Sequence, residues 1–399
     1  MRRLQCAPIS PTKAIRKRSA QPDKCRRTPI LTQKTEIRFT DLVASLPAAV
    51  PFVGPETLER RRGKPFDARL GANESSFGMS PKAVQALTEA ATRGSWYGDA
   101  ESWPVREKLA KIHGVAPDQI LVGAGIDAIL GNTVRMMAGP GTPVVTSLGA
   151  YPTFNYHVSG FGAALNPVPF RNDHEDPEAL LDKVRETDAP LVYFSNPNNP
   201  MGTWHAADVV QSLIDRIPDG TVLVLDEAYI EFAPEGTAPA LDPDNPKVLR
   251  MRTFSKAHGM AGLRIAYTIG HRDLITGLNK VRNHFEVNVL AQAAALASLN
   301  DPDFLASVVA EVARGRDDYM ELAERLGYKA IPSATNFVSI DLGRDGDYAR
   351  AALQALDAAG IFVRMPGVAP MDRCIRVTVG NAEERRLFAD RFESVMKTL

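Results

Sequence analysis

Short apolar runs alternate with amphipathic segments through the middle of the chain. Apolar runs of strand length predict strands, and apolar residues three or four positions apart predict helices. The predicted strands cover residues 119–125, 142–147, 190–196, 221–229, 248–255 and 263–270. The predicted helices cover residues 81–94, 105–114, 126–137 and 207–217. Strands that are apolar on both faces and alternate with helices indicate a mostly parallel sheet that is covered on both sides.

The pattern changes near residue 280, where longer helical segments are separated by a few short strands. Strands predicted at 336–343, 361–364 and 375–380, with a final helix from Glu383, indicate a second, smaller α+β unit. We expect an α/β protein with a basic, disordered tail (1–40), an N-terminal segment that packs with the small domain (41–78), a large ligand-binding domain (79–278) and a small C-terminal domain (279–399). No apolar run reaches the roughly 18 residues that a membrane-spanning helix needs, so no membrane partner is expected.

Charge changes this picture only at the start of the chain. The formal net charge is zero over 399 residues, and no overall field points to nucleic acid. Residues 1–38 nevertheless hold eleven Lys or Arg and two Asp or Glu, with few large apolar residues, which predicts disorder. An organellar transit peptide and a solvated tail both fit this composition. We expect a cytoplasmic protein, with an organelle as the alternative location if the tail is a transit peptide.

Cysteine and histidine usage excludes two classes of site. The three cysteines form no CxxC pair and no disulfide framework, which suits a reducing compartment. The seven histidines show no spacing typical of metal ligands, so we expect no metal centre.

Ligands of parallel sheets bind beyond the carboxyl ends of the strands, which gives weight to the residues that follow each strand. GAGIDA (Gly123–Ala128) lies between a predicted strand and a helix. It fits a dinucleotide fingerprint, but the next strand offers no acid for a ribose. A single phosphate on the amides of Gly125 and Ile126 is more economical. A tight turn alone also explains the glycines.

Two further strand ends carry polar residues. Asn199 lies in SNPNNPMG, which is either a turn or a rigid support for an amide that donates to a ligand. Asp226 ends the most apolar strand, and a buried carboxylate needs a positive partner. A protonated pyridine nitrogen would serve, and an acid that caps a loop explains the residue equally well. Tyr229, three residues on, would reach the opposite side of such a ring.

The segment TFSKAHGMAGLR (Thr253–Arg264) places a lysine among small residues. A lysine becomes a carbonyl nucleophile when its ammonium is desolvated or held near other cations. Ser255 and Arg264 are typical phosphate ligands, and the small residues let the backbone approach a ligand closely. An aldehyde for Lys256, a phosphate, and a ring with a nitrogen and a hydroxyl together describe pyridoxal phosphate.

From about Leu70 to the C-terminus the sequence resembles the fold-type I, class I/II aminotransferases, and most of all their histidinol-phosphate aminotransferase branch. The resemblance rests on WYGDAESWPVREKLA, NPNNPMG, LDEAYIEF, TFSKAHGMAGLRIAY, TNF and IRVTVG. It implies the aspartate-aminotransferase-like fold, pyridoxal 5'-phosphate as cofactor, and a homodimer with composite active sites. Small-molecule amino donors and 2-oxo acids, rather than nucleic acid, would be its partners.

The resemblance also implies a role for each matching residue. Lys256 would bind the cofactor aldehyde and transfer the proton, and Asp226 would pair with the pyridinium nitrogen. The other implied cofactor contacts are Tyr229 and Asn199 at the phenolic oxygen, Tyr151 on the ring face, Ser255, Arg264, Gly125 and Ile126 at the phosphate, and Tyr97 from the partner subunit. The implied substrate contacts are Arg376 at the α-carboxylate, Arg364 at the distal group, Asn336 and Asn73.

Three functions therefore remain as hypotheses. The first is an aminotransferase that moves an amino group between an amino acid or amino-alcohol phosphate, histidinol phosphate-like or aromatic, and a 2-oxo acid such as 2-oxoglutarate. The second is a decarboxylase of a phosphorylated amino acid such as threonine phosphate on the same scaffold. The third, a non-catalytic ligand-binding module, is disfavoured because the tail shows no helix-turn-helix pattern. Departures from the family at NESSFG (73–78), Met201 and His258 leave the substrate open.

Overall fold

The computed structural model describes residues 37–47 and 53–399. Most of the basic tail, for which the sequence predicts disorder, lies outside the described residues. Contacts within the chain separate Met1–Thr40 from Asp41–Leu399, and every described helix and strand belongs to the second part. Its first two helices are short: α1 spans Asp41–Ser45 and α2 spans Pro55–Arg62.

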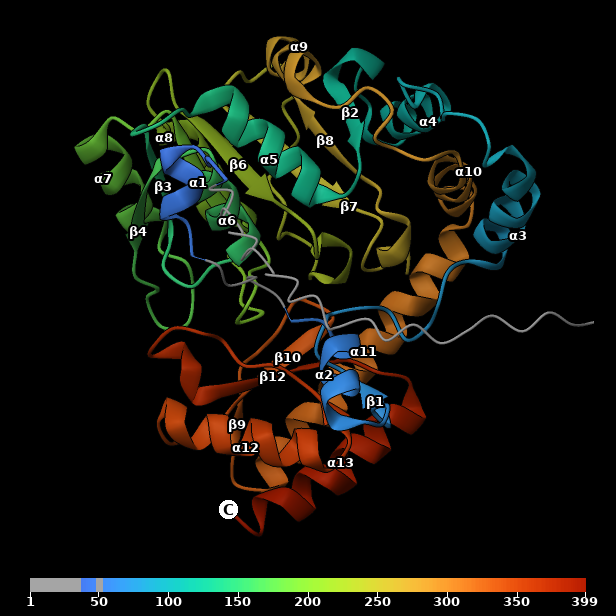
Figure 1. Ribbon diagram of the computed structural model, residues 1–399, viewed down its shortest axis with the longest axis vertical. Helices are drawn as coiled ribbons and strands as arrows, with labels where there is room; N and C mark the ends of the chain where they lie inside the picture. The colour runs from blue at the N-terminus through green and yellow to red at the C-terminus, as the bar shows by residue number, and fades with distance from the viewer. Residues whose placement is uncertain (1–36, 48–52) are drawn as a thin grey trace, which may run out of the picture. The chain divides into compact units, whose positions relative to one another are not determined.

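A seven-stranded sheet lies at the centre of the larger part of the fold (Figure 1). Its strands are β2 (Ile120–Gly123), β3 (Pro143–Ser147), β4 (Ala164–Val168), β5 (Leu191–Ser195), β6 (Val222–Asp226), β7 (Val248–Thr253) and β8 (Ala266–Gly270). The spatial order is β2-β8-β7-β6-β5-β3-β4. Strand β8 runs opposite to the other six strands, and the prediction of a mostly parallel sheet is confirmed.

Both faces of this sheet are buried, because successive side chains of a strand point to opposite faces. On β5, Leu191 and Tyr193 pack with helices α5 (Ile126–Met137), α6 (Pro152–Gly160) and α9 (Arg272–Val281). Val192 and Phe194 of the same strand pack with α7 (Pro177–Thr187) and α8 (Ala207–Arg216) on the other face. This two-sided burial explains why β5 and β6 are apolar at every position before their last residue.

A third group of helices covers the β2 and β8 end of the sheet. It consists of α3 (Pro81–Ala90), α4 (Trp103–His113) and α10 (Val289–Ser298), whose apolar residues pack with those of β2 and β8. Helix α10 contacts α3 and α4, although the sequence-based division places it in the smaller domain. The division at residue 278 stays a prediction.

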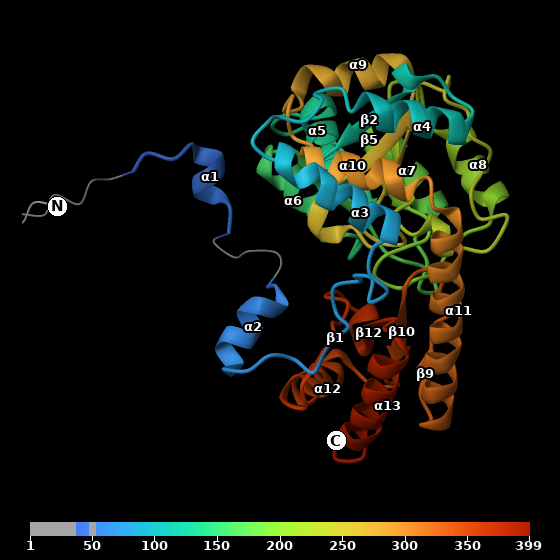
Figure 2. The same ribbon diagram turned by 90° about the vertical axis from the view of Figure 1, so that its right-hand side faces the viewer.

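A second, antiparallel sheet has the order β12-β10-β9. Its strands are β9 (Lys329–Ala330), β10 (Phe337–Asp341) and β12 (Cys374–Thr378), and a separate parallel pair joins β1 (Ala68–Arg69) to β11 (Ile361–Phe362). Helices α11 (Pro302–Arg325), α12 (Gly346–Ala358) and α13 (Ala382–Met396) complete this part, and Figure 2 shows α11 beside β9. Its apolar core also includes Tyr229 and Ala257, each of which lies beside a strand end of the larger sheet.

Two predicted strands are shorter in the structure, for a local reason in each case. The run 221–229 pairs only as far as Asp226, because the Asp226 carboxylate then accepts the backbone N–H of Ala228 at 2.9 Å in a turn. The run 263–270 begins to pair at Ala266, because Arg264 adopts a left-handed φ of 57° that no strand contains. Both interruptions place a charged side chain at the edge of the sheet.

Replacing Gly259 with alanine is expected to destabilise the fold. Gly259 has a φ of +69°, and an added Cβ would lie 1.9 Å from the carbonyl oxygen of Gly78. We expect urea denaturation to show a loss of about 2–4 kcal/mol of unfolding free energy, from backbone strain and overpacking. Gly262→Ala is the matched control in the same loop, since its Cβ would meet nothing within 4 Å. Equal midpoints for the two variants would contradict the prediction.

Candidate active site

A cavity of about 780 Å³ opens at the carboxyl ends of the parallel strands and is shared with residues of the smaller sheet. The cavity brings together most of the residues that the sequence singled out: Asn73, Ile126, Tyr151, Asn199, Asp226, Tyr229, Ser255, Lys256, Arg264, Arg364 and Arg376. These residues come from segments that are far apart in the sequence, so only the fold explains their proximity.

Lys256 follows β7 and points its amine at two backbone carbonyls. Nζ donates to the carbonyl oxygen of Asn73 at 3.0 Å, and it lies 3.5 Å from that of Ala72. Burial, and then the positive charge of Arg376, lower the pKa of Lys256 from 10.5 to about 8. A large share of the amine is therefore neutral, and nucleophilic, in mildly basic solution.

Asp226 is a buried carboxylate at the end of β6. Its oxygens accept hydrogen bonds from the Tyr193 hydroxyl at 2.7 Å and from the Ala228 N–H at 2.9 Å. Within residues 37–47 and 53–399 no lysine or arginine forms an ion pair with it. Burial, opposed by these two hydrogen bonds, raises the pKa of Asp226 to about 6. The site thus holds a carboxylate that a cationic ligand group would stabilise.

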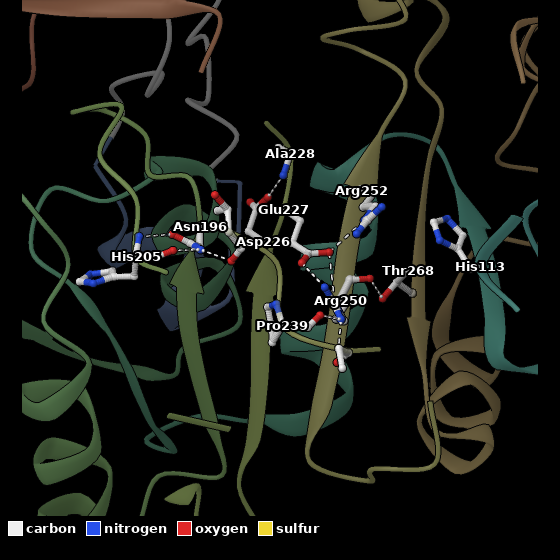
Figure 3. Close-up of polar contacts among 12 residues, drawn as sticks. His113, Asn196, His205, Asp226, Glu227, Ala228, Pro239, Arg250, Arg252 and Thr268 are labelled. Carbon is white, nitrogen blue, oxygen red and sulfur yellow. Dashed lines mark hydrogen bonds and ion pairs between the residues drawn. The ribbon is translucent and has the colours of Figure 1, made fainter. Parts of the chain in front are cut away.

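The next residue, Glu227, has its partners on the other neighbouring strand (Figure 3). Its carboxylate forms ion pairs with Arg250 and Arg252 of β7, and Arg250 also donates to the carbonyl of Pro239 at 3.0 Å. Although burial opposes it, the two guanidiniums hold the pKa of Glu227 below its ordinary value. This buried triad fixes the end of β6, and with it the position of Asp226.

Asn73 connects four residues of the site. Its φ of 54° turns the backbone into the left-handed region, so that its carbonyl accepts from Lys256 and also from Asn336 Nδ2 at 3.1 Å. Its amide nitrogen Nδ2 donates to the Tyr229 hydroxyl at 2.9 Å, and its backbone N–H donates to Thr378 Oγ1 at 3.0 Å. Burial raises the pKa of Tyr229 to about 12, so the phenol stays protonated. Asn73 therefore orients both Tyr229 and Lys256.

Two arginines face the cavity from the smaller sheet, where Arg364 and Arg376 form an antiparallel bridge. Arg376 donates through Nη1 to Asn199 Oδ1 at 2.6 Å and through Nη2 to the carbonyl of Gly71 at 3.1 Å. Its buried Nε has no hydrogen-bond partner in the part of the chain that the structure describes. Arg364 donates to the carbonyl of Val53 at 2.8 Å. The pair concentrates positive charge on this wall and suits an anionic ligand group.

The opposite end of the cavity resembles a phosphate cradle. Ile126 is the first residue of α5, whose N-terminal amides favour an anion. Gly125 has a φ of +87°, and a Cβ there would lie 2.5 Å from Arg264 Nη2. Ser255 is buried on the neighbouring loop. A guanidinium, a hydroxyl and a helix N-terminus are together the groups that commonly bind a phosphate.

Three expected site residues do not line the cavity. Gly125 lies against the Arg264 guanidinium, and Asn336 contacts the site through Asn73. Tyr97 is 81% exposed, and its ring packs at a tilt against Phe285 with ring centroids 4.7 Å apart. The roles implied for these residues by resemblance stay predictions.

Sequence reasoning missed two residues that contact the site. Asp127 lines the cavity, accepts the Tyr151 hydroxyl at 2.8 Å, and lies 3.6 Å from Arg264 Nη2. Its position in the first turn after Gly125 was a usable signal. Tyr193 donates to Asp226 from the middle of β5, where an apolar run hides any functional signal.

Two features are absent from the described residues: a group of metal ligands and a membrane-spanning helix. Across 37–47 and 53–399, no group of three or more His, Cys, Asp or Glu side chains is arranged to hold a metal ion. In the same ranges no helix has the length and apolar character needed to cross a membrane.

The fold and this site define an enzyme class. The family model for aminotransferases of class I and II matches residues 68–392. The chain therefore belongs to the class I and II aminotransferases.

Named relatives point further within the class. The chain is 32% identical over 356 residues to histidinol-phosphate aminotransferase 2 of Carboxydothermus hydrogenoformans. The match covers 88% of this chain and 97% of that protein. It is 34% identical to histidinol-phosphate aminotransferase 1 of Nitrosococcus oceani, over 86% of this chain and 92% of that protein.

Solved structures agree with these relatives. The histidinol-phosphate aminotransferase of Sinorhizobium meliloti, solved with pyridoxal-5'-phosphate, is 45% identical, with a TM-score of 0.89 over 92% of this chain and 99% of that one. An aspartate aminotransferase of Thermus thermophilus, at 23% identity and a TM-score of 0.75, shares the fold over 90% of this chain and all of that one. The prediction of an aspartate-aminotransferase-like fold is confirmed.

Proposed function

We propose that this aminotransferase uses pyridoxal phosphate to move an amino group from histidinol phosphate, or a similar amino-alcohol phosphate or aromatic amino acid, to a 2-oxo acid such as 2-oxoglutarate. The observation that carries the proposal is the single cavity that joins Lys256, Asp226 and Arg376. The named relatives of the chain support the choice of donor.

The residues of the cavity fit pyridoxal phosphate. Asp226 is a buried carboxylate that lacks a cation among the described residues, and a protonated ring nitrogen supplies one. Lys256 offers an amine of lowered pKa to an aldehyde, and Arg264 with the α5 N-terminus suits a phosphate. When bound, the cofactor supplies an electron-withdrawing ring that stabilises negative charge at the substrate carbon.

The chain's own residues would perform the remaining work. Lys256 would carry the proton between substrate atoms, since an amine with a pKa of about 8 can both accept and release a proton near neutral pH. Asn199 would donate from Nδ2, because Arg376 already occupies its Oδ1. The Tyr229 hydroxyl, protonated and held by Asn73, would donate beside it.

The arginine wall supports a phosphorylated donor. Arg364 and Arg376 are bridge partners and both line the cavity, so their guanidiniums place two positive charges on the same wall. A phosphate dianion would gain more from this pair than a carboxylate would, because both its charge and its acceptor number are larger.

The experiment that tests the proposal is rapid mixing of the loaded enzyme with one donor at a time. Histidinol phosphate, an aromatic amino acid, glutamate and phosphothreonine would each be mixed while the cofactor absorption is recorded. We expect the visible band to move into the near ultraviolet fastest with histidinol phosphate. Release of carbon dioxide without that change would instead support the decarboxylase, and no change with any donor would contradict the proposal.

The rate at which the apoenzyme captures pyridoxal phosphate should follow the pKa of Lys256. Only the neutral amine attacks an aldehyde, so the rate should rise with pH, pass a midpoint near 8, and level off above it. With an exposed lysine, the rate would keep rising until about pH 10.4. Stopped-flow absorbance between pH 6.5 and 10 measures this, with Lys82→Ala as the control at an exposed site. A rate still climbing steeply at pH 10 would be the contrary result.

We also propose a homodimer with composite active sites, with each Tyr97 serving the partner's cavity. Trp96, Tyr97 and Phe285 are 73%, 81% and 55% exposed, a cluster of aromatic surface that a second copy would cover. Sedimentation velocity should give twice the mass of one chain, and Tyr97→Ala should weaken cofactor binding. A monomer at micromolar concentration would contradict this assembly.

A cytoplasmic location is a further proposal, supported by a sequence of only three cysteines without a disulfide framework. Import into an organelle is the alternative for the basic N-terminal residues. A fluorescent protein fused behind residues 1–40 would distinguish the two by where it accumulates.

A further inference from the structure

Glu175 is a buried carboxylate that neither the sequence motifs nor the proposed mechanism uses. It lies between β4 and α7, and its side chain accepts hydrogen bonds from Ser147 Oγ at 2.7 Å, Ser195 Oγ at 2.6 Å and Asn198 Nδ2 at 2.7 Å. The backbone N–H of Ser195 adds a fourth bond at 3.2 Å. Glu175 is 1% exposed, and no Lys or Arg of the described chain forms an ion pair with it.

Burying a carboxylate without a cationic partner is unfavourable in free energy, and its hydrogen bonds must offset this desolvation penalty. Burial raises the pKa of Glu175, and the hydrogen bonds from Ser195, Ser147 and Asn198 oppose that shift. Two of the donors are fixed: Ser195 N–H belongs to the backbone, and Asn198 presents its Nδ2 because its Oδ1 accepts Met201 N–H at 3.1 Å. The position therefore requires an acceptor. An apolar residue would leave the Ser195 N–H unpaired and would leave Asn198 Nδ2 with Ser195 Oγ, at 3.2 Å, as its remaining acceptor.

The donors belong to segments that carry cofactor contacts. Ser147 is the last residue of β3, four residues before Tyr151. Asn198 precedes Asn199, and Ser195 lies opposite Asp226 in the β5–β6 register. Glu175 thus joins the two loops that bring Tyr151 and Asn199 to the same cavity.

The Asn199 loop is held at its other end as well. Figure 3 shows Asn196 facing His205, with the His205 N–H donating to Asn196 Oδ1 at 2.8 Å and Asn196 Nδ2 donating to the His205 carbonyl at 3.1 Å. The His205 ring reaches back to the Glu175 carbonyl, 2.8 Å from its Nε2. Glu175 therefore restrains the loop between Asn196 and His205 at two points, through its carboxylate at Asn198 and its carbonyl at His205.

We propose that Glu175 is a positioning residue for pyridoxal phosphate: its carboxylate fixes the Asn199 and Tyr151 loops relative to one another, so that both contact the cofactor ring. Asn199 also orients Arg376 through the bond from Nη1, so the same carboxylate acts on the substrate wall. The inference rests on the cofactor of the proposed function and is independent of the identity of the amino donor.

Two substitutions distinguish the hydrogen-bonding role of the Glu175 carboxylate from the volume that its side chain fills. Glu175→Gln keeps an acceptor oxygen for Ser195 and Asn198, and the Ser147 hydroxyl can turn to accept from the new amide. Glu175→Leu keeps the approximate volume and removes every acceptor. We expect the leucine variant to bind pyridoxal phosphate at least about tenfold more weakly and to lose most of the visible circular dichroism of the bound cofactor. The glutamine variant should stay within about threefold of the wild type in both measurements.

The readouts are an absorbance titration of apoenzyme with pyridoxal phosphate and the visible circular dichroism of the loaded protein. Glu178→Gln, at a half-exposed side chain three residues away, is the matched control and should change neither. A leucine variant with wild-type affinity and dichroism would overturn the proposal, and so would a glutamine variant as impaired as the leucine one. If wild-type protein fails to bind the cofactor, the proposed function fails first.

Ser147→Ala covers the case in which the leucine variant does not fold. This change removes one donor to Glu175 and leaves the carboxylate in place. We expect a smaller loss of affinity, about threefold, with a matching decrease in dichroism. Folded Ser147→Ala protein that is unchanged in both readouts would overturn the proposal.

Discussion

Replacing Lys256 with alanine is expected to lower kcat by at least about 10⁴-fold while leaving the fold intact. The variant loses both the amine that binds the cofactor aldehyde and the base that carries the proton. In the wild type, Lys256 Nζ bonds two backbone carbonyls, at 3.0 and 3.5 Å, and lies 5.7 Å from the centroid of the Tyr229 ring, so the substitution removes few contacts. Single-turnover absorbance with histidinol phosphate and steady-state assays of product would measure the effect.

Lys256→Arg is the matched control for charge. Arginine stays protonated at every working pH, so it restores the positive charge without a nucleophile and should be as inactive as alanine. Substitution of the exposed Lys82 should leave kcat unchanged. Turnover by Lys256→Ala within tenfold of the wild type would remove Lys256 from the chemistry altogether.

Replacing Asp226 with asparagine should lower kcat by about 10²–10³-fold. The change keeps the shape of the side chain but removes the negative charge. The asparagine oxygen can still accept the Ala228 N–H, and the Tyr193 hydroxyl can turn to accept from the new amide. The cofactor nitrogen would then lose the partner that keeps it protonated, and the ring would stabilise charge at the substrate carbon less well. Steady-state kcat, with the pH dependence of the cofactor absorption, measures the effect.

Tyr193→Phe provides a graded comparison, because it removes one hydrogen bond to Asp226 and keeps the charge. Its effect on kcat should stay below about tenfold. A kcat for Asp226→Asn within threefold of the wild type would show that the carboxylate does not act on the ring. The same result for both variants would point to packing rather than charge.

The pattern of apolar and polar residues predicted most strands of the larger sheet, because strands buried on both faces appear in the sequence as continuous apolar runs. The helix predicted at 126–137 coincides with α5, and the strands at 190–196 and 221–229 contain β5 and β6. Strand β4 was not predicted, because its residues Ala164–Val168 contain a proline and an asparagine at the edge of the sheet. The reach of α10 back to α3 depends on tertiary contacts that no local pattern encodes.

Site residues could be predicted from the sequence only where a reactive residue had small or polar neighbours. Lys256 and Asp226 could be singled out in this way, and the cavity contains both. Glu175 could not, because its donors are separated from it by up to 28 positions of sequence. Asn73 was identified by resemblance alone, and its link between Lys256 and Tyr229 depends on a backbone conformation that sequence does not display.

The opposite partners of Asp226 and Glu227 carry a consequence for mutational tolerance. Asp226 turns toward Tyr193 on β5 and the cavity, whereas Glu227 turns toward the arginines of β7 (Figure 3). Two neighbouring residues therefore control different properties: Asp226 controls activity and Glu227 controls stability. In a library that varies both positions, clones with abundant but inactive enzyme should carry changes at 226, and clones with little accumulated protein should carry changes at 227.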